Sequence, residues 1–339
     1  MVIIMDMVCI IITPDTMKNN RITVTGGAGF IGSNLCEKLL EFDNHVICLD
    51  NFSTGKRNNI EDFLANPNFT LMEGDIRDLD TCRKAVEKAD YVLHEAALGS
   101  VPRSIKDPVT SNDVNISGFL NMLVAARDAG VKRFVYAASS SVYGDSVSLP
   151  KVEEIVGKPL SPYAITKYVN ELYADVFSKT YQMECVGLRY FNVFGRRQRP
   201  DGVYAAVIPK FIIKLMNHET LVINGDGNHS RDFTYIDNVI QANLLALLTE
   251  NPQAINTVYN IAYGERTTLN QLVNYLKTFL SIYDKDILEV EVLYGPPLAG
   301  DIPHSLASIV KAKDLLGYNP EYSMKDGLKE SVEWYFNNY

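Results

Sequence analysis

The sequence has little basic charge, little cysteine and little histidine, and each shortage excludes a class of protein. Its 339 residues carry 32 Lys and Arg against 41 Asp and Glu, a formal net charge of −9, whereas nucleic-acid binding needs clustered positive charge. The five cysteines form no C-x-x-C pair, and the five histidines show no H-E-x-x-H spacing. We therefore expect no nucleic-acid partner, no metal and no disulfide framework, but reduced thiols in a cytoplasmic protein.

Long apolar runs are also missing. Residues 2–12 are mostly apolar, but Asp6 interrupts them and no Lys or Arg precedes them. Such a segment is too short to cross a bilayer and lacks the basic start of a signal peptide, so we expect no membrane association. Residues 1–17 are either a short N-terminal extension or a mis-assigned start, with translation beginning at Met17.

What is present is an ordinary globular composition, 47% hydrophobic and 22% charged, in which short β-rich runs alternate with helical ones. This alternation predicts an α/β fold, a doubly wound parallel Rossmann sheet with a smaller α+β substrate-binding lobe. We expect residues 18–188 plus 230–262 to form the first unit and 189–229 plus 263–339 the second. The expected strands cover 21–25, 45–50, 69–73, 91–94, 133–137 and 184–188, and the expected amphipathic helices include 31–41, 113–129 and 324–336.

A glycine-rich loop between the first strand and the first helix predicts phosphate binding. Gly26, Gly29 and Gly32 follow a G-x-x-G-x-x-G spacing. Without Cβ atoms the backbone closes a tight turn and approaches a pyrophosphate at the helix N-terminus, where free N–H groups favour an anion.

An acid at the end of the second strand predicts which dinucleotide binds. Asp50 comes 18 residues after Gly32, where a carboxylate accepts hydrogen bonds from a ribose diol and repels a 2′-phosphate. NAD is therefore favoured over NADP, although Arg57 slightly weakens that preference. Asp75 and Ile76, after the third strand, either flank the adenine or simply begin a helix.

A second group of residues predicts proton-transfer chemistry. Tyr163 and Lys167 are four residues apart, so on a helix the ammonium lies near the phenol and favours its ionised form. Upstream, Ser139, Ser140 and Ser141 stand at the end of a predicted strand, where hydroxyl groups contact a substrate. The alternatives are a solvated helix face for the Tyr–Lys pair and capping of the next turn for the serines.

Taken together, these motifs and the run from Arg189 to Gly195 resemble the extended short-chain dehydrogenase/reductase family. Within it the chain resembles the UDP-hexose 4-epimerases, specifically those acting on UDP-N-acetylglucosamine, on the run from His94 to Ser104. The resemblance covers the chain from Arg21 onward. It implies an NAD-dependent enzyme that interconverts UDP-N-acetylglucosamine and UDP-N-acetylgalactosamine, and UDP-glucose and UDP-galactose, through a transient 4-keto sugar. It also implies a homodimer built through two helices per subunit. The apolar positions of 119–126 and 168–177 are compatible with such an interface, but they could equally face the core.

The resemblance also implies a role for individual residues. Tyr163 is the expected base, Lys167 lowers its pKa, and Ser139, or else Ser141, is the catalytic hydroxyl. The expected cofactor-binding residues are Gly26, Gly29, Phe30, Ile31, Gly32, Asp50, Asn51, Asp75, Ile76, Ala96, Tyr163, Lys167 and Tyr190. The expected substrate-binding residues are Gly99, Ser100, Arg103, Ser139, Ser140, Ser141, Tyr163, Asn192, Val207, Lys210, Val222, Asn224, Arg231 and Ser305.

Departures from the family pattern bear on the substrate. Relatives carry an arginine that binds the diphosphate where this chain has Leu298, and Pro303 and Ser308 also differ. Ser305 stands where relatives restricted to unacetylated sugars have a tyrosine, so it leaves space for an N-acetyl group.

Proteins of this family type also have other activities, and the residues bear on each of them. Dehydratases and decarboxylases need a carboxyl group where this chain has Ser140 and Ser141, so both are disfavoured. One open alternative is a 4-epimerase of UDP-uronic acids, of the UDP-glucuronate or UDP-N-acetylgalactosaminuronate type, in which Arg103 pairs with the sugar carboxylate. The other is a non-catalytic NAD-binding scaffold.

Overall fold

The fold is described from a computed structural model that covers residues 13–201, 205–297 and 304–339. The expectations for residues 1–12, Cys9, Leu298 and Pro303 lie outside these ranges. Within them, Met17 at the end of the first short helix packs into the hydrophobic core. The other four cysteines are buried free thiols.

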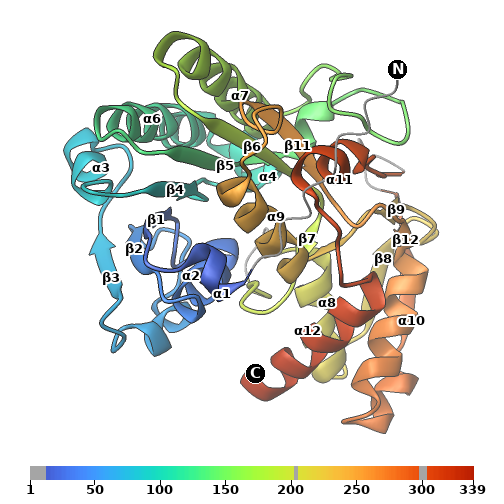
Figure 1. The fold of residues 1–339 in the computed structure, drawn as a ribbon. Coiled ribbons are helices and arrows are strands. Elements are labelled where there is room, and N and C mark those ends of the chain that lie inside the picture. The colour runs from blue at the N-terminus through green and yellow to red at the C-terminus, as the bar shows by residue number, and fades with distance from the viewer. Residues whose placement is uncertain (1–12, 202–204, 298–303) are drawn as a thin grey trace, which may run out of the picture.

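The centre of the molecule is a seven-stranded parallel sheet with the strand order β11-β6-β5-β4-β1-β2-β3 (Figure 1). The predicted doubly wound parallel sheet is thereby confirmed. The strand order reverses at β1, which pairs with β4 on one side and with β2 on the other, and ligands bind at such a switch point outside the carboxyl ends of the strands. The strands of this sheet are β1 (Arg21–Thr25), β2 (His45–Asp50), β3 (Phe69–Glu73), β4 (Tyr91–His94), β5 (Arg133–Ser139), β6 (Cys185–Tyr190) and β11 (Thr257–Ile261).

Each face of the sheet buries its own hydrophobic cluster, because successive side chains of a strand point to opposite faces. In β5, Val135 belongs to the cluster under α2 and α9, whereas Phe134 and Tyr136 belong to the cluster under α3, α6 and α7. The helices are α1 (Pro14–Met17), α2 (Phe30–Glu41), α3 (Leu79–Ala85), α4 (Val101–Lys106), α5 (Pro108–Asn112), α6 (Phe119–Asp128), α7 (Pro162–Tyr181), α8 (Val207–Met216), α9 (Ile236–Leu248), α10 (Leu269–Leu280), α11 (Val310–Leu316) and α12 (Met324–Asn338).

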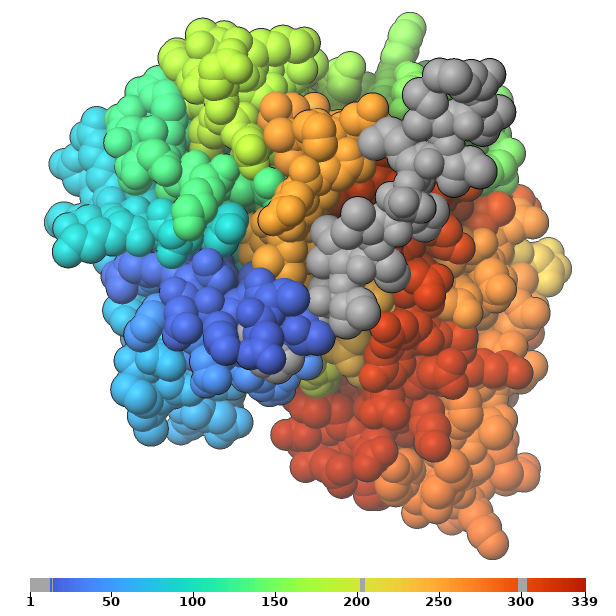
Figure 2. All heavy atoms as spheres, in the orientation of Figure 1, coloured from blue at the N-terminus to red at the C-terminus, as the bar shows by residue number. Residues whose placement is uncertain are grey.

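The second half of the chain adds a smaller part with short strands, in which α8, α10 and α12 pack together (Figure 1). In the space-filling view the early, blue segments and the late, orange and red segments share one face of the molecule (Figure 2). The short strands pair two by two: β7 (Val193–Phe194) with β10 (Thr234–Tyr235), β8 (Leu221–Asn224) with β13 (Val292–Gly295), and β9 (Ser230–Arg231) with β12 (Thr267–Thr268).

The structure corrects three predicted boundaries. Strand β5 continues to Ser139 instead of ending at Ala137, and β6 runs over Cys185–Tyr190 instead of 184–188, because both strands extend to the site. The helix expected over 113–129 is broken: a π-helical segment covers Asp113–Gly118 before α6 begins at Phe119. In the described ranges no helix has both the length and the apolar character needed to cross a membrane.

Candidate active site

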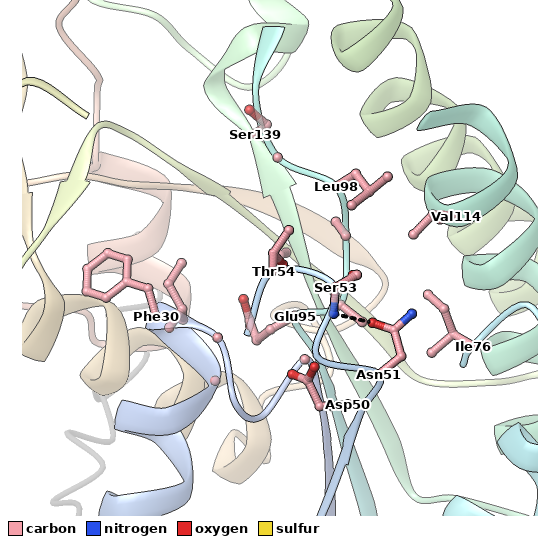
Figure 3. Close-up of a pocket in the computed structure, with 18 of the residues that line it drawn as sticks. Phe30, Asp50, Asn51, Ser53, Thr54, Ile76, Glu95, Leu98, Val114 and Ser139 are labelled. Carbon is pink, nitrogen blue, oxygen red and sulfur yellow. Dashed lines mark hydrogen bonds between the residues drawn. The ribbon is translucent and has the colours of Figure 1, made fainter. Parts of the chain in front are cut away.

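A cavity of about 360 Å³, the main cavity, opens at the carboxyl ends of the parallel strands around the switch point (Figure 3). Its wall contains all the residues predicted to bind the cofactor. These are Gly26, Gly29, Phe30, Ile31, Gly32, Asp50, Asn51, Asp75, Ile76, Ala96, Tyr163, Lys167 and Tyr190. From the predicted substrate set, the wall also includes Gly99, Ser139 and Asn192.

The glycine loop is packed so tightly that side chains have no room at two of its positions. Gly26 has a φ of +66° and its backbone lies against Ala96, where a Cβ would come within 2.8 Å of the amide nitrogen. A Cβ on Gly32 would lie 2.2 Å from the carbonyl oxygen of Gly26. Gly29 is the N-cap of α2, so the free N–H groups of the first helical turn border the cavity and suit a pyrophosphate.

The Asp50 carboxylate is held in place at the end of β2. Its Oδ2 accepts a hydrogen bond from the Ala28 N–H at 2.9 Å and its Oδ1 one from the Phe52 N–H at 2.8 Å. Burial raises the pKa of Asp50, and these two N–H donors act against that shift. Arg57, which weakened the prediction for NAD, forms an ion pair with Glu73 and its guanidinium lies 4.4 Å from the centre of the Phe52 ring.

Asp75, predicted to flank the adenine, is bonded to its neighbours. It accepts hydrogen bonds from the side chains of Arg77 and Asn51, and the Arg77 guanidinium lowers the pKa of Asp75 to about 2. The Ser53 N–H in turn donates to the side chain of Asn51 (Figure 3). Asp75 is therefore ionised and fixed at the end of the cavity near β3.

The predicted catalytic pair lies in the first turns of α7, which begins at Pro162 because the Ser161 hydroxyl accepts from the Ala164 N–H. The Tyr163 backbone N–H donates to the Ser104 hydroxyl of α4 at 3.0 Å. Lys167 is buried, and its ammonium donates to the carbonyl oxygen of Ala137 at 2.8 Å.

The electrostatics of the pair differ from the expectation in one respect. Burial raises the pKa of the Tyr163 phenol, and a hydrogen bond with Ser139 opposes the shift. Burial also lowers the pKa of Lys167 to about 8. Lys167 points to a backbone carbonyl of β5, so in the protein alone Ser139 is the group that favours the Tyr163 phenolate.

The serine cluster divides between the cavity and its surroundings. Ser139 lines the main cavity and accepts from both the N–H at 3.2 Å and the hydroxyl at 2.9 Å of Ser141. Ser140 and Ser141 belong to the short turn that follows β5 and are not in the lining. Of the two candidates for the catalytic hydroxyl, Ser139 is the one that lies in the lining.

A second cavity of about 410 Å³ adjoins the main one and shares Gly29, Phe30, Thr54 and Gly99 with it. It contains two predicted substrate residues, Ser100 and Arg103, and further along the wall Arg197, Arg199 and Asp201. Two of its three arginines are already paired with carboxylates, Arg197 with Glu37 and Arg199 with Asp201.

The other predicted substrate residues lie on the second part of the chain, outside both linings. Arg231 and Ser305 come together although they are far apart in the sequence, because the Ser305 N–H donates to the carbonyl oxygen of Ser230 at 3.0 Å. The Asn192 side chain joins them by donating to the Asp232 carbonyl oxygen at 2.9 Å. Lys210 and Val207 stand at the start of α8, and Val222 and Asn224 share the exposed face of β8.

Two residues that sequence reasoning missed help to build the site. Glu95 lines the main cavity; the available signal was a charged residue directly after an apolar strand. Asn115, in the π-helical segment, bonds both the N–H and the carbonyl of Leu98 and the hydroxyl of Thr166. It thereby joins the cavity wall at Leu98 to α7, and no local pattern in the sequence indicated it.

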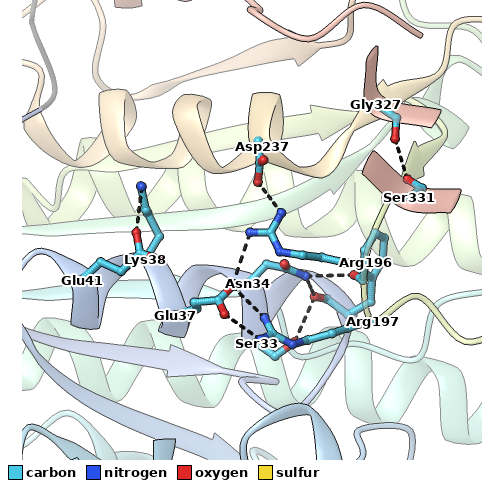
Figure 4. A network of polar contacts seen from close by, with 11 residues as sticks. Ser33, Asn34, Glu37, Lys38, Glu41, Arg196, Arg197, Asp237, Gly327 and Ser331 are labelled. Carbon is cyan, nitrogen blue, oxygen red and sulfur yellow. Dashed lines mark hydrogen bonds and ion pairs between the residues drawn. The ribbon is translucent and has the colours of Figure 1, made fainter. Parts of the chain in front are cut away.

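A network of ion pairs ties the cofactor side to the second cavity (Figure 4). Glu37 of α2 accepts two hydrogen bonds from Arg197, at 2.7 and 2.9 Å, and one from Arg196 at 3.3 Å. Arg196 also bonds Asp237 of α9 at 2.7 Å. Because α2 begins at the glycine loop, this network sets the loop against the segment that lines the second cavity.

Comparison with known proteins identifies the family. A family model described as "NAD dependent epimerase/dehydratase family" matches residues 22–262. The chain belongs to this family. This confirms the predicted membership of the extended short-chain dehydrogenase/reductase family. It also confirms the prediction of NAD as the cofactor.

Individual relatives match over almost the whole chain. A putative UDP-glucose 4-epimerase of Methanocaldococcus jannaschii is 39% identical over 94% of this chain and 99% of its own. A UDP-N-acetylglucosamine 4-epimerase from Methanobrevibacter ruminantium, solved with UDP-N-acetylmuramic acid, is 38% identical with a TM-score of 0.86 over 95% of this chain and 100% of that chain. A UDP-glucuronic acid 4-epimerase from Bacillus cereus, solved with UDP-glucuronic acid and NAD, is 33% identical with a TM-score of 0.84 over 94% and 100%.

The residues present fit NAD. The glycine loop leaves a cradle that a Cβ at Gly26 or Gly32 would fill, and Asp50 presents a fixed carboxylate at the end of β2. Among the described residues no cluster of three or more His, Cys, Asp or Glu side chains could hold a metal ion.

Proposed function

We propose that this enzyme is a UDP-sugar 4-epimerase that interconverts UDP-N-acetylglucosamine and UDP-N-acetylgalactosamine, and also UDP-glucose and UDP-galactose. The observation that carries the proposal is that Tyr163 and Ser139 lie in the wall of the same cavity as the glycine loop and Asp50. The turn after Ser139 offers the hydroxyl groups of Ser140 and Ser141 where an elimination would need an acid. The 4-epimerase activity of several relatives supports the same reaction.

Each residue of the pair has a defined task in this reaction. NAD, when bound, supplies the hydride acceptor. Tyr163 removes the proton from the sugar 4′-hydroxyl and returns it later. Ser139 donates a hydrogen bond to the same oxygen and stabilises its negative charge. We propose that Lys167, whose ammonium donates to the Ala137 carbonyl oxygen, holds the nicotinamide ribose.

The two parts of the chain bind different molecules in this proposal. We propose that residues 18–188 and 230–262 hold NAD and that residues 189–229 and 263–339 hold the UDP-sugar. Asn192 and Arg231, joined through the segment from Ser230 to Asp232, are the proposed contacts of the diphosphate. Anchoring the substrate at its UDP end leaves the 4-keto hexose free to turn over and to receive the hydride on its opposite face.

The preference for an acetylated sugar rests on small side chains. Ser305 lies beside Ser230 and Arg231, and Gly99 borders both cavities with nothing within 4 Å of a Cβ placed on it. Small residues at these positions leave volume for an N-acetyl group next to the hexose. The solved relative that binds UDP-N-acetylmuramic acid supports a pocket of this size.

A second candidate is a 4-epimerase of UDP-uronic acids, and one observation favours it. Arg103 lines the second cavity, which adjoins the main one. Arginine pairs with carboxylates through two parallel hydrogen bonds, and the Bacillus cereus relative acts on such a sugar.

The test is to incubate the purified protein, without added NAD, with UDP-N-acetylglucosamine, UDP-glucose and UDP-glucuronic acid in parallel and to follow the anomeric protons by NMR. Formation of UDP-N-acetylgalactosamine supports the proposal. Conversion of UDP-glucuronic acid alone refutes the proposal and supports the second candidate. No conversion of any sugar, even with NAD supplied, refutes both candidates and favours the scaffold.

We further propose a cytoplasmic homodimer. Buried free thiols fit a reducing compartment. The apolar side chains of 119–126 were predicted to be available for pairing, but they are largely buried in the core. The exposed apolar side chains lie elsewhere: Ile105 and Val109 in the α4–α5 segment, and Ile165, Leu172 and Val176 in α7. Light scattering after gel filtration tests the dimer, and Leu172→Asp is expected to produce monomers.

A further inference from the structure

Glu95 stands at the centre of the site without a task in the proposed reaction. It follows the last residue of β4, where neighbouring side chains point to opposite faces of the sheet. His94 packs among Phe119 and Phe134 on one face, so Glu95 points to the other face and into the wall of the main cavity (Figure 3).

The Glu95 carboxyl group is anchored by a short chain of hydrogen bonds. The Asn243 side-chain amide of α9 donates to the Tyr190 hydroxyl at 2.9 Å, and that hydroxyl donates to Glu95 Oε1 at 2.9 Å. Tyr190 and Asn243 are buried, so the acceptor end of the chain is fixed in one place. A carboxyl group held in this way keeps its position while its charge changes.

Burial makes that charge sensitive to pH near neutrality. It raises the pKa of Glu95 to about 7, and the Tyr190 hydroxyl and the Lys167 ammonium oppose the rise. The ionisable side chains that act on Glu95 are Tyr190 from β6 and Lys167 and Tyr163 from α7, while α9 contributes the uncharged Asn243.

We propose that Glu95 is a positioning residue of the catalytic centre: its carboxyl group, anchored by Tyr190 in the cavity wall, acts on the charges of Lys167 and Tyr163 and so controls when the Tyr163 phenol loses its proton. This inference rests on the proposed role of Tyr163 as the base. It assigns to the acid after β4 a function that the reaction itself does not require.

The direction of the effect follows from the charges. Ionised Glu95 repels the Tyr163 phenolate and therefore raises the pKa of the phenol, in addition to the effect of burial. It also stabilises the Lys167 ammonium, as Glu171 does, and both carboxylates counter the lowering of that pKa by burial. The phenol titrates where Glu95 is already ionised, so removing this negative charge lowers the pKa of Tyr163.

The test is a pH titration of the NAD-bound enzyme that records tyrosinate absorbance, with Tyr163→Phe subtracted to isolate one phenol. Glu95→Gln is expected to lower the Tyr163 midpoint, whereas Glu95→Asp, which keeps the charge, is expected to leave it nearer the wild-type value. Glu153→Gln is the matched control, because Glu153 is a buried carboxyl that lies outside both cavity linings.

A wild-type midpoint in Glu95→Gln overturns the inference. If that variant does not fold, Tyr190→Phe releases the same carboxyl from its anchor and is expected to lower the midpoint by a smaller amount; an unchanged midpoint there overturns the inference equally. The titration needs no turnover, so absence of epimerisation refutes the proposed function without obscuring this result. Where a sugar is converted, the acid limb of kcat/KM is expected to move to lower pH in Glu95→Gln.

Discussion

The packing of the glycine loop predicts a specific loss of cofactor in Gly32→Ala. The added Cβ would lie 2.2 Å from the Gly26 carbonyl oxygen and 2.8 Å from both the Gly26 carbonyl carbon and the Gly27 Cα. All three are backbone atoms, and the same oxygen accepts the hydrogen bond from the Gly29 N–H at 2.9 Å. The loop and the start of α2 must therefore separate by about 1 Å to reach ordinary contact.

This displacement has two opposing energies. Overpacking of a tight contact costs about 1–3 kcal/mol, while alanine in a helix is favoured over glycine by about 1 kcal/mol. The fold should therefore survive, with the strain concentrated where the N–H groups meet the pyrophosphate. A loss of about 1.4 kcal/mol or more in binding weakens the Kd for NAD at least tenfold.

The assay is the amount of NAD that copurifies with the protein, followed by calorimetric titration of the stripped protein with NAD. Gly295→Ala is the matched control, because a Cβ there meets its nearest atom at 3.5 Å and lies outside the main cavity. A wild-type Kd in Gly32→Ala would refute the reasoning. An equal loss in Gly295→Ala would show that the effect is not local.

Three further predictions concern single side chains. Tyr163→Phe should abolish turnover while NAD still copurifies, and turnover at the wild-type rate would remove Tyr163 from the mechanism. Glu171→Gln leaves the buried Arg189 guanidinium without the charge that it bonds at 2.7 and 2.8 Å, so urea unfolding should show a loss of about 3 kcal/mol; a loss below 1 kcal/mol would contradict this. Burial lowers the pKa of His94 to about 3, and the unfolded chain takes up its proton near pH 6.5. Stability should therefore fall by about 1.4 kcal/mol per pH unit as the pH drops through that interval, and His94→Gln should remove this slope; an identical slope in both proteins would refute the assignment.

The residues that line the glycine-loop side of the main cavity could be predicted because their signals are local. Three glycines at fixed spacing, an acid at the end of the second strand and a Tyr–Lys pair one helical turn apart each act within a single strand–loop–helix unit. The predicted bounds of β1 to β4 agree with the structure for the same reason, since continuous apolar runs end at polar residues.

The rest of the site depends on contacts between distant segments. Asn115 reaches Leu98 and Thr166 from a π-helical segment that a helical pattern cannot distinguish from an α-helix. Ser305 meets Ser230 beside an isolated bridge between Ser230 and His304, which is too short to leave a periodic signal. Glu95 was visible in the sequence, but its partners Tyr190 and Asn243 come from β6 and α9.

The measurement that tests the central claim most directly is the fate of the hydrogen on carbon 4 of the sugar. UDP-N-acetylglucosamine carrying deuterium at that carbon is incubated with the purified enzyme in ordinary water, and the product is analysed by mass spectrometry and NMR. The account predicts UDP-N-acetylgalactosamine that keeps its deuterium at carbon 4, because oxidation and reduction occur in one closed site. Product with hydrogen from the solvent at that position, or no product, would contradict it.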